Sequence, residues 1–292
     1  MSMFLFLSQL LNGLLDGFYY LLIAIGLSLI FSLGGIVNLA HGAFFAIGAY
    51  LATALTPYTG FFGAVILVPL IVAGLGMIVE RLLFTRFYRA DPLYSLLLTF
   101  GLAMIIEQAL RWSFGAAPLA YNMPDLLRGQ VLMGDFIYSR YRIFLITVAI
   151  LAVAALWLLL NRTTFGRIVR AGIQNPDILG AMGISLRPYL SAVAGIGIGL
   201  AGLAGVLMAP IVPVHPAMGT EVLTAAFVVV VIGGLGSFWG VVLAAILVGV
   251  VKGFVIGIDL PSWSLAAIYL LMFLVLLLRP RGLMGERILR FE

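Results

Sequence analysis

Four polar side chains inside long apolar stretches are the residues of this sequence that could do chemistry. Asn38 and His41 stand three residues apart and would share one face of a helix. Glu107 and Gln108 lie roughly a turn and a half from the end of another apolar stretch. Such groups are costly in a membrane unless they face protein or a water-filled path. All four are therefore candidates for lining a translocation path. Alternatively, Asn38 and His41 cap a helix start at the cytoplasmic interface.

Other ionisable groups near the apolar stretches have simpler interpretations. Glu80 and Arg81 fall at the end of one stretch, where a solvated or locally paired role is the default. Lys252 sits within another stretch and can extend its long side chain towards the membrane surface. Neither Lys252 nor Glu107 has an obvious partner in the sequence. Transport driven by ions, which requires ionisable groups near the membrane midplane, is therefore not favoured.

Motifs for catalysis and nucleotide binding are absent from the sequence. There is no cysteine, and the patterns HExxH, GxSxG and GxxxxGK[ST] do not occur. The last of these cradles the phosphates of ATP, so this chain is not expected to hydrolyse ATP itself. We predict that the chain is not an enzyme and that it binds no metal and no cofactor.

The segment 161–187 carries the clearest local signal of structure. Asn175 can cap the free amides of a helix start, Pro176 suits the first helical position, and Asp177 complements the helix dipole. Gly183 is a natural stop. The pattern predicts a helix of roughly two turns whose apolar side chains are Ile178, Leu179, Ala181 and Met182. Such a helix either docks into a groove on a cytoplasmic partner or lies on the lipid surface.

The elements around these residues follow from composition. Of the 292 residues, 64% are hydrophobic and 9% are charged, against about 25% charged in a soluble domain. A crossing helix needs about 20 apolar residues. We predict an all-α polytopic transmembrane bundle, a single domain over 1–292, with nine spans, or eight because 222–236 is short. The spans are 17–36, 38–56, 61–79, 93–110, 143–160, 188–209, 222–236, 238–258 and 263–279.

Arginine counts predict the orientation of the spans. Eleven arginines fall in one set of loops and four in the opposite set, and the richer set is expected in the cytoplasm. With nine spans the N-terminus is then outside and the C-terminus is cytoplasmic. The net charge of +5 is explained by this asymmetry, so nucleic acid is not an expected partner. The segment 195–205 carries five glycines and predicts close helix packing.

Several strings together resemble one known family. They are Arg167 to Ile184, Gly34 to Gly42 (GGIVNLAHG) with Gly48-Ala49-Tyr50, Ala201 to Leu207, Gly233 to Ser237 (GGLGS), and Arg279 to Leu283. In this order they are similar to the branched-chain amino-acid permeases of the LivH type, which belong to bacterial ABC importers. The resemblance extends over nearly the whole chain.

The resemblance implies the partners of the chain. It implies two cytoplasmic P-loop ATPase subunits that hydrolyse ATP, a second sister permease, a periplasmic or extracellular substrate-binding protein, and a small polar solute. Residues of the segment 161–187 would then couple the permease to the ATPases. They are Arg167, Arg170, Asn175, Asp177, Ile178, Leu179, Met182 and Gly183.

Two positions depart from the family pattern. Ala43 stands where the family often has an acidic residue, and Leu179 stands where it usually has a small alanine. The second departure predicts a groove on the ATPase shaped for a larger side chain.

The resemblance indicates a permease of a bacterial-type inner membrane that imports branched-chain amino acids by ATP-driven alternating access. Urea or short amides are the next substrates, since similar permeases exist for those. A stand-alone channel or an ion-coupled secondary transporter is the alternative from a different class. Such proteins have no use for a helix that docks an ATPase, so the segment 161–187 discriminates between the two classes.

Overall fold

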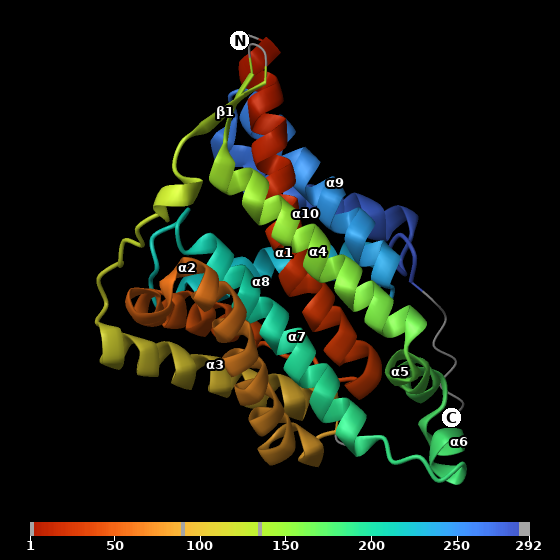
Figure 1. The fold of residues 1–292 in the computed structure, drawn as a ribbon. Coiled ribbons are helices and arrows are strands. Elements are labelled where there is room, and N and C mark those ends of the chain that lie inside the picture. Colours follow the sequence, from red (N-terminus) through yellow and green to blue (C-terminus); the bar gives the residue numbers. More distant parts are fainter. Residues whose placement is uncertain (1–2, 89–90, 134–135, 286–292) are drawn as a thin grey trace.

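The computed structural model describes residues 3–88, 91–133 and 136–285. Residues 286–292, which include the C-terminus predicted to be cytoplasmic, lie outside the described residues. The chain is a helical bundle with one short antiparallel hairpin, in which Gln130 pairs with Ser139 and Met133 with Phe136 (Figure 1). The α-helices are α1 Met3–Gly34, α2 His41–Leu82, α3 Pro92–Phe114, α4 Arg140–Arg162, α5 Thr164–Gln174, α6 Pro176–Ala181, α7 Arg187–Met208, α8 Met218–Gly233, α9 Phe238–Gly257 and α10 Ser264–Leu278. The strands are β1 Gln130–Met133 and β2 Phe136–Ser139, and short 3-10 helices cover Phe84–Arg86, Asp125–Leu127 and Pro261–Trp263.

The predicted all-α membrane bundle is confirmed. Seven helices in the described part of the chain are long and apolar enough to cross a membrane. The apolar windows of α3 and of the helix over Pro261–Leu278 are only 11% and 6% buried, so their side chains are available to lipid. α8 has 16 residues and is shorter than a full crossing requires, as expected for the short predicted span 222–236. The number of crossings and their direction stay predictions.

Helix α2 contains a break that divides it into two arms. Gly60 adopts φ 70° and ψ 170°, a backbone conformation outside the helical region, and Pro57 precedes it. Both arms then pack on α7, since Gly48 of the first arm and Val72 of the second arm both approach Gly202. The sequence places the predicted spans 38–56 and 61–79 on either side of this break.

The first helix begins before the predicted span 17–36. α1 starts at Met3, so Asp16 lies inside the helix and not at its end. The residues before Asp16 are apolar or uncharged and continue the helix, and the one carboxylate is satisfied by another helix. A single charge is therefore compatible with a continuous helix here.

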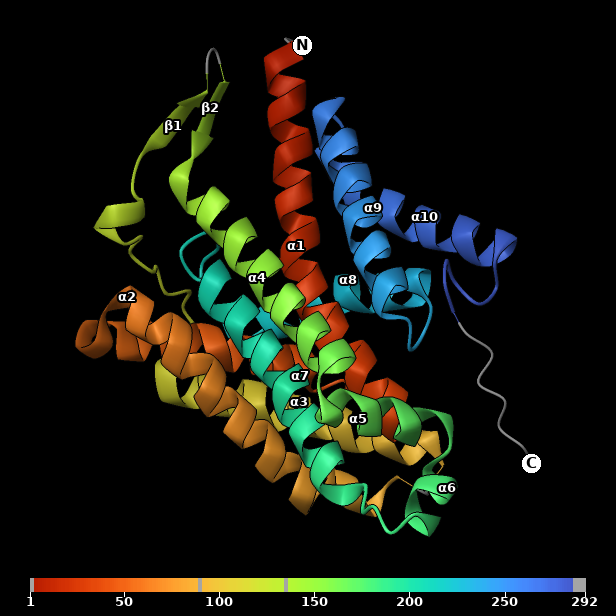
Figure 2. The ribbon, with the colours of Figure 1, turned by 45° about the vertical axis from the view of Figure 1, so that its right-hand side comes forward.

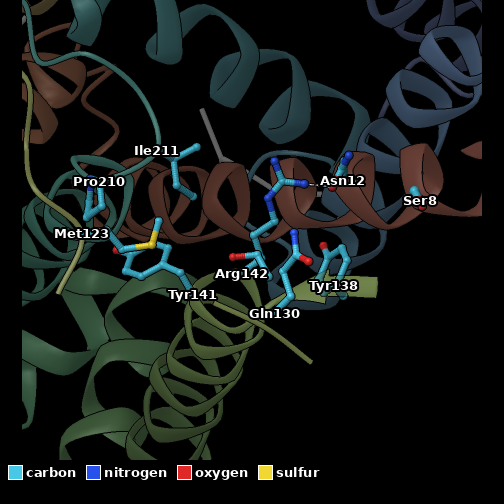
Figure 3. A pocket seen from close by; sticks show the side chains of 10 residues that line it. Ser8, Asn12, Met123, Gln130, Tyr138, Tyr141, Arg142, Pro210 and Ile211 are labelled. Carbon is cyan, nitrogen blue, oxygen red and sulfur yellow. Dashed lines mark hydrogen bonds between the residues drawn. The ribbon is translucent and has the colours of Figure 1, made fainter. Parts of the chain in front are cut away.

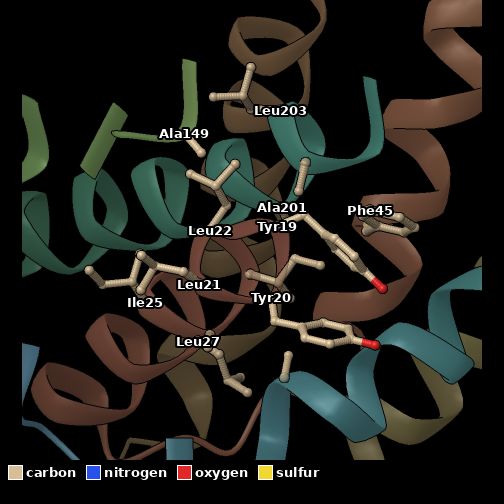
Figure 4. Close-up of a cluster of buried hydrophobic side chains, with 14 of the residues drawn as sticks. Tyr19, Tyr20, Leu21, Leu22, Ile25, Leu27, Phe45, Ala149, Ala201 and Leu203 are labelled. Carbon is tan, nitrogen blue, oxygen red and sulfur yellow. The ribbon is translucent and has the colours of Figure 1, made fainter. Parts of the chain in front are cut away.

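Close contact between helix backbones holds α7 at the centre of the bundle (Figure 2). A Cβ built on Gly26 of α1 would lie 2.4 Å from the carbonyl oxygen of Gly197, and one built on Gly205 would lie 2.1 Å from that of Phe45 in α2. Glycine at these positions allows van der Waals packing that lipid itself does not drive. The predicted packing seam is thus confirmed. Figure 4 shows the buried side chains beside it, among them Tyr19, Tyr20, Phe45, Ala201 and Leu203.

We expect Gly205→Leu to prevent folding, because its side chain would meet the backbone of α2 and not a mobile side chain. Overpacking of this kind costs about 3 kcal/mol or more. Gly74→Leu is the matched control, since a Cβ at Gly74 meets nothing within 4 Å. The yield of monodisperse protein after detergent extraction measures both variants. Equal yields would show that α2 and α7 do not pack this closely.

The two ends of the bundle carry different elements. The N-terminal part of α1 and the β1–β2 hairpin lie at one end, and α5 and α6 lie at the opposite end (Figures 1 and 2). The polar groups described below are therefore distributed between two separate regions.

Candidate functional site

The predicted short helix in the segment 161–187 is present as α6. Asn175 Oδ1 accepts from the backbone amides of Asp177 and Ile178 at 3.1 and 3.0 Å, and Pro176 occupies the first turn. Gly183 has φ 80°, which a left-handed helix end requires, and the Ile184 amide donates to the Leu179 carbonyl at 3.2 Å. Asp177 is exposed. The helix therefore begins and ends where the sequence predicts.

The side chains of α6 face two directions, which corrects the role predicted for Leu179. Leu179 is only 5% exposed and packs within its own chain, so it does not present a larger side chain to a partner. Ile178 of α6 and Met182, the residue that caps the C-terminal end of α6, are 60% and 70% exposed and stand four residues apart. The apolar surface that α6 offers to another molecule consists of these two side chains.

Helix α5 was not predicted from the sequence. Thr163 caps it by accepting from the Gly166 amide at 3.2 Å. Its signal was the spacing of Phe165, Ile168, Val169, Gly172 and Ile173, which places apolar residues on one helix face. α5 ends at Gln174 and α6 starts at Pro176, so only the capping Asn175 lies between them.

The two arginines of α5 differ in what they contact. Arg170 donates to the Leu160 carbonyl and, at 3.1 Å, to Asn161 Oδ1, which fastens α5 to the end of α4. Arg167 donates to Thr164 at 3.0 Å and is exposed. Both side chains are exposed, but only Arg170 connects α5 to another helix.

Asn38 and His41 are fully buried at the junction of α1 and α2. Asn38 Oδ1 accepts from the Ala40 amide at 3.1 Å, and His41 Nε2 lies 3.1 Å from the Ile23 carbonyl of α1. Asn38 therefore stabilises the turn before α2, but the N-cap of α2 is Ala40 and no side chain caps the free amides of the helix, so the capping predicted for Asn38 and His41 is not what the structure shows. Asn38 Nδ2 and His41 Nδ1 are buried without a hydrogen-bond partner among the described residues. A role of either side chain in a path stays a prediction.

Thr99 of α3 forms hydrogen bonds to the backbone of the same junction, and the sequence analysis did not identify it. Its hydroxyl accepts from the Leu39 amide at 3.1 Å and lies 3.1 Å from the Val37 carbonyl. A lone threonine in an apolar helix carries no sequence signal for such a contact.

We expect Thr99→Val to lower the free energy of unfolding by about 1 to 3 kcal/mol, because it leaves the Leu39 amide without a partner. Thr99→Ser keeps the hydroxyl and is expected to lose less. The melting temperatures of the purified variants in one detergent measure the difference. A valine variant as stable as the serine variant would rule out the contact.

Glu80 is buried, so of the two roles expected from the sequence, solvated or locally paired, the solvated role is excluded. Its carboxylate accepts from the Tyr88 hydroxyl at 2.9 Å and from the Ser191 hydroxyl of α7. Burial and the neighbouring Glu80 carboxylate raise the pKa of Tyr88, so its phenol stays protonated and donates. Glu80 thus connects α2, the segment after it and the start of α7.

Glu107 and Gln108 lie apart from Asn38 and His41. Glu107 forms an ion pair with Arg111, one turn further along α3, at 3.0 Å, and Gln108 is exposed. The structure of the single chain therefore does not bring the four predicted path residues together.

Lys252 has a partner that the sequence did not reveal. Its Nζ lies 2.5 Å from Asp16 Oδ2 and 3.2 Å from the Tyr20 hydroxyl, which joins α9 to α1. The two charged side chains are 21% and 22% exposed. The pair was missed because its members are 236 positions apart by their numbers and Asp16 was placed outside the first span.

These features define a multi-pass integral membrane protein, with long apolar helices and a capped helix pair at one end. Residues 9–276 match the family described as the permease component of branched-chain amino acid transport systems, and the chain belongs to that family. The predicted relation to LivH-type permeases is thereby confirmed. The chain is accordingly a multi-pass transport subunit and not an enzyme.

Named relatives agree with this family. The chain is 29% identical to the high-affinity branched-chain amino acid transport system permease protein BraD of Pseudomonas aeruginosa, over 96% of each chain. It is 27% identical to LivH of Salmonella typhimurium, again over 96% of each chain. It is 28% identical to LivM of Escherichia coli over 91% of this chain and 67% of that protein. No solved structure is significantly similar to the chain.

Proposed function

We propose that this chain is a permease subunit of a binding-protein-dependent ABC importer that carries branched-chain amino acids into the cell. Two cytoplasmic P-loop ATPases hydrolyse ATP, and their motion drives alternating access of a path formed with a second, sister permease. A periplasmic or extracellular binding protein delivers the amino acid. The chain acts as one membrane domain, 1–292, in a bacterial-type inner membrane.

The exposed apolar pair on α6 is the observation that carries this proposal. Ile178 lies on a capped helix of six residues that is too short to span the membrane, and Met182 is the residue that ends this helix. Large exposed side chains elsewhere mostly belong to membrane-length helices, where lipid covers them. A partner that inserts these two side chains into a groove explains their exposure.

The names of the relatives support two parts of the proposal, the substrate and the second permease. BraD and LivH are named for high-affinity branched-chain amino acid transport, and both align over 96% of this chain. The similarity to LivM as well as to LivH favours a sister permease of related sequence. The carboxylates inside the described membrane-length helices, Asp16, Glu80 and Glu107, are each paired or hydrogen-bonded within the chain, which leaves the chain little means of coupling to ions.

The test is purification from the native membrane followed by reconstitution. The tagged chain is expected to retain two P-loop ATPases and a related permease after gentle extraction. In proteoliposomes with ATP inside and the loaded binding protein outside, radiolabelled leucine, isoleucine and valine are expected to accumulate. ATP replaced by a non-hydrolysable analogue is the control and should abolish accumulation.

Other outcomes would overturn specific parts of the proposal. Accumulation of urea or acetamide in place of the amino acids would change the substrate and keep the importer. A stable homo-oligomer without ATPases that transports solute without ATP would establish a channel or an ion-coupled carrier instead.

A further inference from the structure

A cavity of about 420 Å³ lies at the end of the bundle opposite α5 and α6. It is formed by the N-terminal part of α1, the segment that contains Met123 and leads into the β1–β2 hairpin, the hairpin with the start of α4, and the segment after α7. Its volume falls within the range of small-molecule binding sites. None of the path residues predicted from the sequence lines it.

Arg142 supplies the positive charge of this cavity (Figure 3). Its guanidinium donates to Asn12 Oδ1 and lies 6.0 Å from the centre of the Tyr138 ring. Within the described part of the chain, no carboxylate lies within ion-pair distance of Arg142. A guanidinium has five N–H donors, so several of them remain for a ligand.

A partly buried guanidinium without an anion is unusual in a membrane protein. Arg142 is only partly exposed, and charges removed from water are normally paired. Asp16 is the nearest acidic residue on α1, one turn from Asn12, but it pairs with Lys252. The cavity thus retains the positive charge of Arg142, and no acidic side chain is among the described residues that line it.

The rest of the lining separates polar from apolar groups. Figure 3 shows Met123, Pro210 and Ile211 on one side of Arg142, and Asn12 and Tyr138 on the other. Gln130 adds an amide oxygen that can accept from an ammonium group. Burial raises the pKa of Tyr138, against the opposing effect of Arg142, so its phenol stays neutral. The cavity therefore offers a cation for a carboxylate, oxygen acceptors for an amine, and an apolar wall for a short aliphatic chain.

We propose that this cavity is a substrate site of the permease, in which Arg142 binds the α-carboxylate of a free aliphatic amino acid and Met123 and Ile211 contact its side chain. Guanidinium suits this role because two parallel N–H groups match the geometry of a carboxylate. The proposal rests on the proposed function, under which α6 faces the cytoplasm and the cavity opens to the outside. The amino acid would meet this site after release from the binding protein.

The first experiment measures transport by the complete reconstituted importer. Arg142→Gln is expected to lower leucine uptake by about tenfold or more when the loaded binding protein is saturating. The reason is the loss of a charge-assisted hydrogen bond to the carboxylate of leucine. Arg142→Lys keeps the charge without the paired geometry and is expected to retain intermediate uptake. Arg140→Gln is the matched control, since Arg140 is exposed and lies outside the cavity.

The second experiment detects the amino acid in the cavity of the unmutated protein. The importer, without binding protein, is illuminated with a leucine analogue that carries a diazirine in its side chain. Labelled peptides are expected to contain Met123 or Ile211. Leucine should protect them from labelling, whereas leucinol, which lacks the carboxylate, should not. This measurement does not depend on the folding of any variant.

The outcomes separate this proposal from the proposed function. If the unmutated importer accumulates none of the three amino acids, the proposed function is wrong. If it accumulates them and Arg142→Gln does so equally well, only the site is wrong. A third outcome combines two results: Arg142→Gln raises the concentration of binding protein needed for half-maximal stimulation of ATP hydrolysis, and leucine does not protect the cavity from labelling. Arg142 then contacts the binding protein, and the proposed substrate site is wrong.

Discussion

Replacing Ile178 with arginine is expected to abolish amino-acid uptake and the stimulation of ATP hydrolysis by the loaded binding protein. The side chain is 60% exposed, so the variant should fold and insert normally. The guanidinium would replace an apolar side chain in a small docking surface and would be desolvated there without a partner. This costs several kcal/mol of the free energy with which the ATPase binds α6. Uptake of radiolabelled leucine into proteoliposomes and ATPase activity measure the effect, and Met182→Arg should behave alike.

Two further variants test whether the loss of uptake comes from the apolar docking surface of α6. Ile178→Leu preserves the apolar surface and is expected to retain most of the uptake. Leu179→Arg alters the neighbouring side chain, which is 5% exposed, and is expected to lower the yield of folded protein. Normal uptake by Ile178→Arg at normal expression would mean that α6 does not dock a partner. It would leave the lipid surface as the neighbour of α6.

Removing either member of the Asp16–Lys252 pair is expected to destabilise the permease strongly. Asp16→Asn leaves the ammonium of Lys252 without its anion, and Lys252→Met leaves the carboxylate without its cation. Each charge would then lie between α1 and α9, where both side chains are about one-fifth exposed. A loss of about 3 kcal/mol is expected for each variant, the lower part of the range for buried pairs because of this exposure. The melting temperature in detergent measures it.

The double variant makes the prediction specific to the pair. Asp16→Asn with Lys252→Met removes both charges and is expected to regain most of the lost stability. Glu107→Gln breaks the exposed pair with Arg111 within α3 and should change stability by no more than about 0.5 kcal/mol. A double variant as unstable as the sum of the two single variants would contradict an interaction between Asp16 and Lys252.

Features of the fold that depend on neighbouring residues, such as the ends of α6, were predicted correctly from the sequence. Asn175, Pro176 and Gly183 act through hydrogen bonds and backbone angles within a few residues, so their pattern defines α6. The five glycines of α7 indicate close packing because small residues have few other uses in an apolar helix. Hydrophobic content alone predicted the helical membrane bundle.

Contacts between distant segments could not be predicted in the same way. Asp16 and Lys252 meet only because α1 and α9 pack side by side, and Glu80 is buried only because Tyr88 and Ser191 converge on it. The direction in which Leu179 points depends on how the segment folds back on its own chain. The cavity around Arg142 combines four separate segments, none of which carries a recognisable motif.

The attachment of α5 has a mechanical consequence. Arg170 fastens α5 to the end of α4, and Gly172 lies against Leu33 of α1 and against Leu186, which directly precedes α7. Under the proposed function, a force that a docked ATPase exerts on Ile178 and Met182 would therefore reach α1, α4 and α7 through these contacts of α5, because the helix pair is anchored to all three.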